Sequence, residues 1–252
     1  MLTKLETIIK KVRNQEDEKM TDINKEANVN TEANASAAPK KTEIVFILDR
    51  SGSMGGLEAD TVGGFNSMIE KQKKEPGEAL VSTVLFSDFS AVFHDRVPIG
   101  RVEPLTVEEY FVGGCTALLD AVGDAIHHIG NVHKYARRED VPDKTLFIIT
   151  TDGHENASRN YTYENVKHMI ERQKERYGWE FMFLGANIDA AREARRFGIS
   201  ENMAADYCCD EVGTALNYEA MSCAISEMRK NLCIDPHWKD KIDADYKKRG
   251  RK

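Results

Sequence analysis

The chain has 252 residues and a formal net charge of −7, with 41% hydrophobic and 31% charged residues. This length allows one large domain with tails, or two small domains, and the acidic balance argues weakly against nucleic acid as the main partner. No apolar stretch approaches the ~18 residues that span a bilayer. The first residues contain no continuous apolar signal segment, so we expect neither a membrane segment nor secretion.

Five cysteines are present, an odd number, and none forms a C-x-x-C pair. Reduced thiols explain this usage better than a disulfide framework does. We therefore expect a cytoplasmic protein.

Residues 1–41 differ in composition from the rest of the chain. Apolar residues at helical spacing from Leu2 to Val12 predict a short amphipathic helix. The stretch that follows is rich in Asn, Ala, Thr, Glu and Lys, and it cannot bury enough surface to order itself. We interpret it as a flexible linker whose helix docks on a partner or on the domain; a frayed tail without a role is the alternative.

Residues 42–231 alternate between strand and helix patterns. Strands are expected at 44–48, 80–86, 89–93, 144–151, 179–184 and 203–207, and helices at 57–74, 117–133, 163–176, 190–197 and 212–230. This alternation, with one early hairpin, predicts an α/β domain: a doubly wound, mostly parallel sheet with one antiparallel strand and helices on both faces. Residues 232–252 are strongly charged, and we expect a solvated tail.

Polar side chains cluster where the two most apolar strands end. Asp49, Ser51 and Ser53 follow the run Ile44 to Leu48 at alternate positions, and Asp152 follows the strand that ends in Thr150-Thr151. Ligands in open α/β sheets bind outside the carboxyl ends of strands, and hard oxygen ligands suit Mg²⁺. The alternative is that these residues only cap helices and form turns.

Thr116 completes the candidate set. It follows Gly113-Gly114-Cys115 and stands where a hydroxyl would cap the next helix. Neighbouring loops at one edge of the sheet could bring it to the two aspartates and two serines.

The combination of these motifs resembles the von Willebrand factor type A (VWA) domain over residues 42–231. Asp49 to Ser53 matches the family's D-x-S-x-S, Thr116 its isolated threonine, and Asp152 the aspartate of its T-D-G loop. The resemblance implies a Rossmann-like six-stranded sheet and a metal ion-dependent adhesion site (MIDAS). It also implies that Mg²⁺ (or Mn²⁺) is held by these five residues and binds an Asp or Glu of a partner protein.

The same resemblance suggests the surroundings of the site and the kind of partner. Gly114, His154 and Glu155 would form a rim that contacts the partner; exposure to solvent alone is the other interpretation of His154 and Glu155. Relatives inside cells work with AAA+ ATPases, which makes an AAA+ ATPase one candidate partner of an adaptor or scaffold. We expect no nucleic acid or membrane partner.

Two other functions are compatible with parts of the sequence. A metal-dependent phosphohydrolase could use Asp49 as a nucleophile, but Ser51 stands where its D-x-D motif needs a second carboxylate. A metal-free interaction protein could retain the same residues as turn formers. A titration with Mg²⁺ or Mn²⁺ distinguishes this last class from a metal-dependent module.

Overall fold

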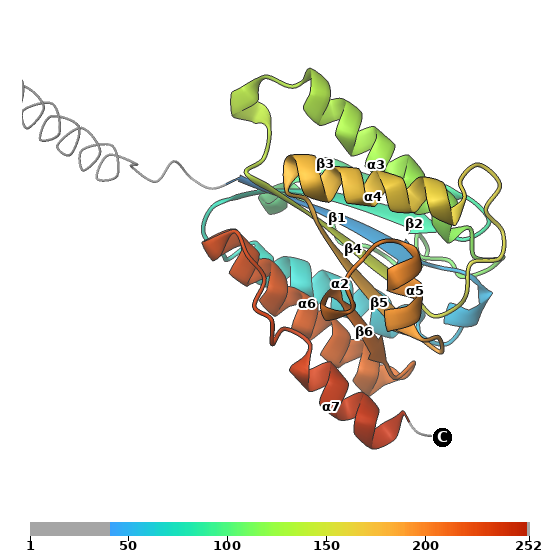
Figure 1. Ribbon diagram of the computed structural model, residues 1–252. Coiled ribbons are helices and arrows are strands. Elements are labelled where there is room, and N and C mark those ends of the chain that lie inside the picture. Colours follow the sequence, from blue (N-terminus) through green and yellow to red (C-terminus); the bar gives the residue numbers. More distant parts are fainter. Residues whose placement is uncertain (1–40, 251–252) are drawn as a thin grey trace, which may run out of the picture. The chain divides into compact units, whose positions relative to one another are not determined.

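The computed structural model describes residues 41–250 and contains one six-stranded sheet in the order β3-β2-β1-β4-β5-β6 (Figure 1). The strands are β1 (Lys41–Asp49), β2 (Glu78–Phe86), β3 (Ser90–Pro98), β4 (Lys144–Thr151), β5 (Glu180–Ala186) and β6 (Ala204–Tyr207). Only β3 runs antiparallel to its neighbour; the other pairings are parallel. The predicted fold class is therefore confirmed. The predicted N-terminal helix and nearly all of its linker lie outside the described residues.

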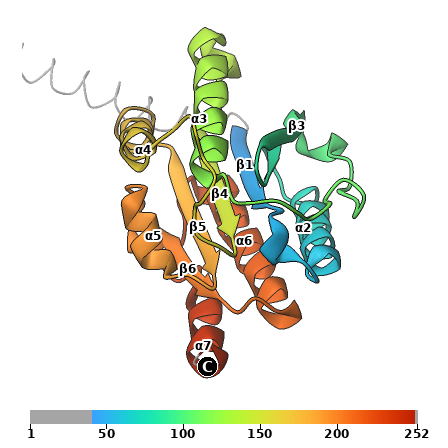
Figure 2. The same cartoon turned by 90° about the vertical axis from the view of Figure 1, so that its right-hand side faces the viewer.

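Helices cover both faces of the sheet (Figures 1 and 2). On one face lie α2 (Glu58–Gln72), α6 (Glu211–Asn231) and α7 (Asp240–Arg249), and on the other α3 (Leu118–Tyr135), α4 (Tyr163–Tyr177) and α5 (Ala190–Arg196). Short 3-10 turns occur at Gly52–Met54, Ile99–Arg101, Arg138–Asp140 and Glu201–Met203. Each face thus has its own hydrophobic core.

The central strand β1 explains why the sheet needs two cores. Ile44, Phe46 and Leu48 pack into the core beneath α2 and α6, whereas Val45 and Ile47 pack into the core beneath α3 and α4. Successive side chains of a strand point to opposite faces, so a run that is apolar at every position must be covered on both sides. The run Ile44–Leu48 therefore fixes β1 in the middle of the sheet.

The end of the chain differs from the solvated tail that its charge predicts. Helix α7 packs beside β6 and α6, with Ile242 only 2% exposed. Trp238 is also buried, and its indole N–H donates to the Asn202 carbonyl at 2.9 Å. Trp238 lies just before α7 and Ile242 in its first turn, and both belong to the core beneath α2 and α6. These two side chains hold α7 against β6 and α6, although most residues around them are charged.

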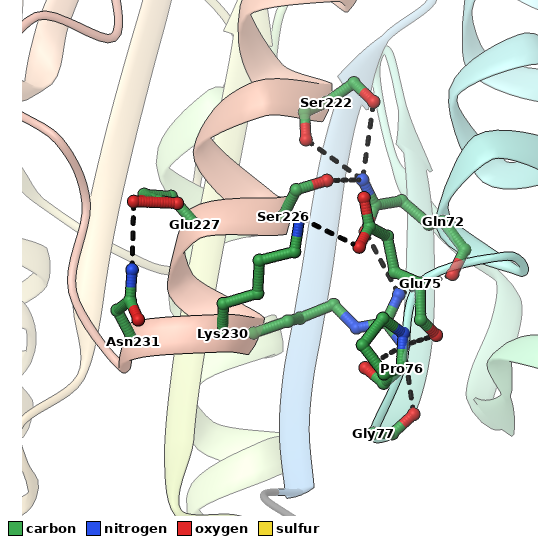
Figure 3. A network of polar contacts seen from close by, with 10 residues as sticks. Gln72, Glu75, Pro76, Gly77, Ser222, Ser226, Glu227, Lys230 and Asn231 are labelled. Atoms are coloured by element: carbon green, nitrogen blue, oxygen red, sulfur yellow. Dashed lines mark hydrogen bonds and ion pairs between the residues drawn. The ribbon is translucent and has the colours of Figure 1, made fainter.

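One buried arginine ties α6 to the end of α2. Arg229 is 3% exposed and donates to the backbone carbonyls of Gln72, Glu75, Pro76 and Gly77 at 2.5–3.3 Å. Figure 3 shows the adjoining contacts, in which the Gln72 amide donates to Ser222 and Ser226. Gln72 is the last residue of α2, and the other three carbonyls belong to the turn that follows it. The guanidinium therefore joins α6 to the end of α2 and to this turn.

Replacing Arg229 tests this tie. Arg229→Met should lower the free energy of unfolding by about 3 kcal/mol, because it removes the charged hydrogen bonds that a buried guanidinium donates to four backbone carbonyls. The neighbouring Lys230 pairs with Glu75 at 3.1 Å on a more exposed surface (Figure 3). As a control, Lys230→Met should cost less than about 1 kcal/mol. Urea denaturation of both variants measures the difference, and equal losses would contradict the role given to Arg229.

Candidate metal centre

The strand register brings the two aspartates to one edge of the sheet. β1 and β4 are parallel neighbours, and Leu48 pairs with Thr150. Asp49 therefore ends β1 beside Thr151, and Asp152 begins the loop that follows. Both carboxylates leave the carboxyl ends of adjacent strands, which is the position expected from the sequence.

Hydrogen bonds connect the residues of the first and third loops. Ser53 Oγ donates to Asp152 Oδ1 at 2.6 Å and lies 3.2 Å from Ser51 Oγ. Asp49 Oδ1 accepts from the Ser51 backbone N–H, and Asp49 Oδ2 accepts from the Thr151 hydroxyl, both at 2.7 Å. These contacts hold two carboxylates and two serine hydroxyls in one connected array.

Thr116 reaches the same space from the loop before α3. A methyl group built on Gly153 would lie 3.6 Å from Ser53 Oγ and 3.7 Å from Thr116 Oγ1. Glycine at 153 thus leaves the space between these hydroxyls open. The Thr116 backbone is fixed by Asn156, whose side chain accepts from the Thr116 N–H at 2.8 Å and whose own N–H donates to the Thr116 carbonyl at 3.0 Å.

The loop before α3 is also fastened to the first loop through its backbone. The Gly52 N–H donates to the Gly114 carbonyl at 3.0 Å, and the Gly113 N–H donates to the Arg50 carbonyl at 2.9 Å. Gly114 has a φ of +81°, and a Cβ there would meet Asp88 Oδ2 at 2.0 Å. Only glycine combines this left-handed backbone with so close an approach. The chain therefore needs Gly114 to bring Thr116 beside the serines.

Burial sets the electrostatics of the site. Desolvation raises the pKa of Asp49, against the opposing effect of its hydrogen bonds to Ser51 and Thr151, and the charge of Asp152 raises it further. Desolvation also raises the pKa of Asp152, against its hydrogen bond from Ser53. Two desolvated carboxylates close together favour either a proton or a cation between them.

One oxygen in this array has no partner. Asp152 is 2% exposed, and its Oδ2 is buried without a hydrogen bond, although Oδ1 is engaged by Ser53. A buried acceptor without a donor is costly. A cation coordinated directly or through water would satisfy it. The donor set therefore fits a hard divalent ion.

The set contains oxygen donors only, two carboxylates and three hydroxyls. Within residues 41–250 there is no group of three or more His, Cys, Asp and Glu side chains that could hold a metal. The metal assignment of Asp49, Ser51, Ser53, Thr116 and Asp152 accordingly rests on their convergence and on the unpaired oxygen of Asp152. It favours Mg²⁺ or Mn²⁺ over metals that prefer thiolate or imidazole ligands.

The two other residues expected at the rim differ in their surroundings. His154 is exposed and lines a cavity beside the site with Asn187 and Cys209. Glu155 is engaged inside the chain: its carboxylate accepts from the N–H of Leu119 at 2.9 Å and from Ser158. Glu155 thus connects the loop after β4 to the first turn of α3. Its contact with a partner stays a prediction.

Three further residues contact the site, although the sequence patterns did not indicate a role for them. Thr151 holds Asp49 Oδ2, the buried Tyr110 hydroxyl donates to the Asp49 carbonyl, and Asn187, with a φ of +57°, donates to the Asp152 carbonyl at 3.5 Å. Thr151 adjoins Asp152, so its position as the last residue of the buried strand β4 was a usable signal. Tyr110 and Asn187 lie in loops without a recognisable motif.

An aromatic pair flanks Arg50 next to the site. The Arg50 guanidinium carbon lies 4.1 Å from the centroid of the Phe111 ring and 5.7 Å from that of Phe89. Arg50 is buried and its Nε has no hydrogen-bond partner, whereas Phe89 and Phe111 are 60% and 56% exposed. Exposed large aromatic side chains beside a polar site are typical of a contact surface.

Comparison with known proteins identifies the fold. No family model and no curated protein matches the chain. Among solved structures, it resembles the vWF domain of the pilus tip protein Mfa5 from Porphyromonas gingivalis with a TM-score of 0.56 and 10% identity, covering 75% of this chain and 96% of that one. It also resembles the pilus adhesin SpaC from Lactobacillus rhamnosus GG, with a TM-score of 0.57 and 12% identity. This match covers 75% of this chain and 30% of SpaC.

A third match is proximal thread matrix protein 1 from the mussel byssus, with a TM-score of 0.51 and 16% identity, covering 73% of this chain and 45% of that one. Another structure of that mussel protein holds zinc at its MIDAS motif. The chain thus spans less than half of the mussel protein and of SpaC. At these identities the comparisons establish the VWA fold.

Neutralising Asp152 tests the electrostatics. In Asp152→Asn, the metal-free protein should be at least as stable as the wild type, because burial no longer penalises a charge. Mg²⁺ at about 100 times its Kd should stabilise the wild type by about 2.7 kcal/mol and the variant hardly at all. Melting temperatures with Mg²⁺ and with chelator measure both effects. A shift of wild-type size would exclude Asp152 from the metal site.

Acid should weaken the effect of the metal. Because burial raises the pKa of Asp49 and Asp152 above 3.8, the folded chain binds more protons than the unfolded chain just above that pH. Their contribution to metal-free stability therefore rises as the pH falls through this window, while protons displace the cation. The Mg²⁺-induced rise in Tm should shrink between about pH 7.5 and about pH 4.5. A constant shift over this range would contradict the carboxylate site.

Proposed function

We propose that this chain is a protein-binding module that recognises an Asp or Glu of its partner through Mg²⁺, or Mn²⁺. Asp49, Ser51, Ser53, Thr116 and Asp152 would hold the ion. The unpaired, buried Oδ2 of Asp152 within an array of oxygen donors is the observation that carries this proposal. It is the one carboxylate oxygen of the array that accepts no hydrogen bond from residues 41–250.

The chemistry of the ligands suits recognition of a carboxylate. Serine and threonine hydroxyls are neutral, and Asp49 already directs its oxygens at Ser51 and Thr151. We infer that the hydroxyls bind the ion directly while the aspartates orient hydroxyls and waters. A bound cation would then keep enough positive charge to accept one more carboxylate.

The solved relatives support the same class of function. SpaC is a pilus adhesin, Mfa5 is a pilus tip protein, and the mussel protein has bound zinc at its MIDAS motif. These are properties of those proteins, and we extend to this chain only a cation-dependent contact with another protein.

The surroundings suggest how a partner would sit. Phe89 and Phe111 offer exposed aromatic surface at one side of the site, and His154 is exposed at another. Gly114 keeps its loop close to the serines. We propose that these residues contact the partner around the ion, as the apolar part and the rim of the interface.

An enzymatic role has less support. A D-x-D phosphohydrolase needs a second carboxylate where Ser51 stands, and both oxygens of Asp49 are engaged by the Ser51 N–H and the Thr151 hydroxyl. We therefore propose a non-enzymatic module. A metal-free interaction protein is the competing proposal, and it requires that neither Mg²⁺ nor Mn²⁺ changes the melting temperature.

We also propose a cytoplasmic adaptor or scaffold with a binding domain at 42–231, an N-terminal helix and linker at 1–41, and a C-terminal segment at 232–252. Five free thiols, three of them exposed, support a reducing compartment. No helix within residues 41–250 is long and apolar enough to cross a membrane. An AAA+ ATPase is one hypothesis for the partner, carried by the sequence resemblance alone.

Removing the Thr116 hydroxyl tests the proposal. Thr116→Ala should abolish capture of the partner in a chelator-sensitive pull-down read by mass spectrometry, while the fold survives. The control Thr162→Ala removes a helix cap from α4 and should cost about 1 kcal/mol of stability without affecting capture. Unchanged capture by Thr116→Ala would refute a direct role for Thr116.

A further inference from the structure

A second cavity lies at the other end of the strands from the candidate metal centre. It has a volume of about 730 Å³ and opens between α3 and α4, next to the first residues of β4 and to Trp179 just before β5. Figures 1 and 2 show α3 and α4 together on one face of the sheet. The volume is within the range of pockets that bind small molecules.

The lining of this cavity is entirely cationic or neutral. It includes two lysines, one arginine and three histidines, and no aspartate or glutamate. The whole chain has a net charge of −7, so a pocket without acidic residues departs from the rest of the molecule. Such a pocket attracts anions.

Two of these basic groups already have partners beneath or beside the cavity. His133 Nε2 lies 2.5 Å from a carboxylate oxygen of the buried Glu43, and Lys144 pairs with Glu180 at 3.1 Å. Lys134 and Arg172, on the two facing helices, form no ion pair with any residue of the described range 41–250. Lys134 Nζ lies 5.0 Å from the centroid of the exposed Tyr135 ring. This weak surface contact leaves the charges of Lys134 and Arg172 available to a ligand.

Interaction with the helix dipole explains the position of Lys134 but not that of Arg172. Lys134 is in the last turn of α3, where a cation interacts favourably with the helix dipole. The basic residues in the last turn of α4 are Lys174 and Arg176, and Arg172 precedes them. Arg172 therefore does not serve to stabilise the C-terminal end of α4.

The floor of the cavity is apolar and carries one unused donor. Ile126, Pro142 and Trp179 are buried, and Met169 is half-buried. Trp179 is 4% exposed and stacks on Phe147, yet its indole N–H has no acceptor among residues 41–250. The indole nitrogen is not among the fully buried side-chain atoms that lack a partner, so its N–H is accessible from the cavity, where a ligand oxygen could accept from it.

We propose that this cavity binds a small organic anion, with the apolar body of the ligand on Ile126, Met169 and Trp179 and its anionic group between Lys134 and Arg172. The indole N–H of Trp179 donates to the ligand. The site is separate from the proposed metal centre and does not depend on it.

Anilinonaphthalene sulfonate, a fluorescent aromatic sulfonate, tests the proposal with the full chain. Its fluorescence should titrate to saturation at one site, and amide NMR shifts should map to residues of α3 and α4 around the cavity. Arg172→Glu and Lys134→Glu should each weaken binding roughly tenfold, as expected for the loss of a charged contact. Lys167→Glu is the matched control on α4, because Lys167 pairs with Glu171 at 3.8 Å and does not line the cavity.

The outcomes separate the parts of the proposal. Equal affinities of Arg172→Glu and Lys167→Glu, or shifts that map to the cavity beside His154, would overturn the site. Inorganic pyrophosphate that competes as strongly as the dye would overturn the role of the apolar floor. Melting curves of each variant with Mg²⁺ verify that the fold and the metal response are intact.

Discussion

The structure depends on the burial of two aspartates at the ends of adjacent central strands. Asp49 and Asp152 are nearly inaccessible, and burial raises the pKa of each. Three donors bind these carboxylates: the backbone N–H of Ser51, the hydroxyl of Ser53 and the hydroxyl of Thr151. One oxygen of Asp152 is left over. Buried negative charge at this site therefore exceeds the donors that residues 41–250 supply, and the proposed cation would balance it.

The loops around the aspartates are prepared for such an ion by the backbone. Hydrogen bonds between Gly52 and Gly114 and between Arg50 and Gly113 fasten two loops that are about sixty positions apart in the sequence. Asn156 fastens the third to Thr116. These contacts join backbone and side chains of the three loops, so they hold the hydroxyls in place. Preorganisation of this kind lowers the entropic cost of binding.

The two ends of the sheet differ in chemistry. The carboxyl ends of β1 and β4 present oxygen donors, and the cavity near the start of β4 presents cations over an apolar floor. Buried Glu43 pairs with Arg96 and with His133, a residue that lines that cavity, so the chain itself neutralises this acid. Two ligands of opposite charge could therefore bind one domain without competing.

The sequence by itself determined the alternation of strands and helices, the central place of the run Ile44–Leu48, and the association of Asp49, Ser51, Ser53 and Asp152 with strand ends. These features follow from local patterns, since apolar runs must be covered and parallel strands end at one edge. The metal role of these residues, with Thr116, stays a prediction.

Only the tertiary structure decided the rest. The contacts of Tyr110 and Asn187 with the site, and the docking of α7 through Trp238 and Ile242, join residues far apart in the chain. The cavity between α3 and α4 likewise depends on which side chains of two helices face each other. Such contacts have no periodicity in the sequence, because they arise from the packing of whole elements.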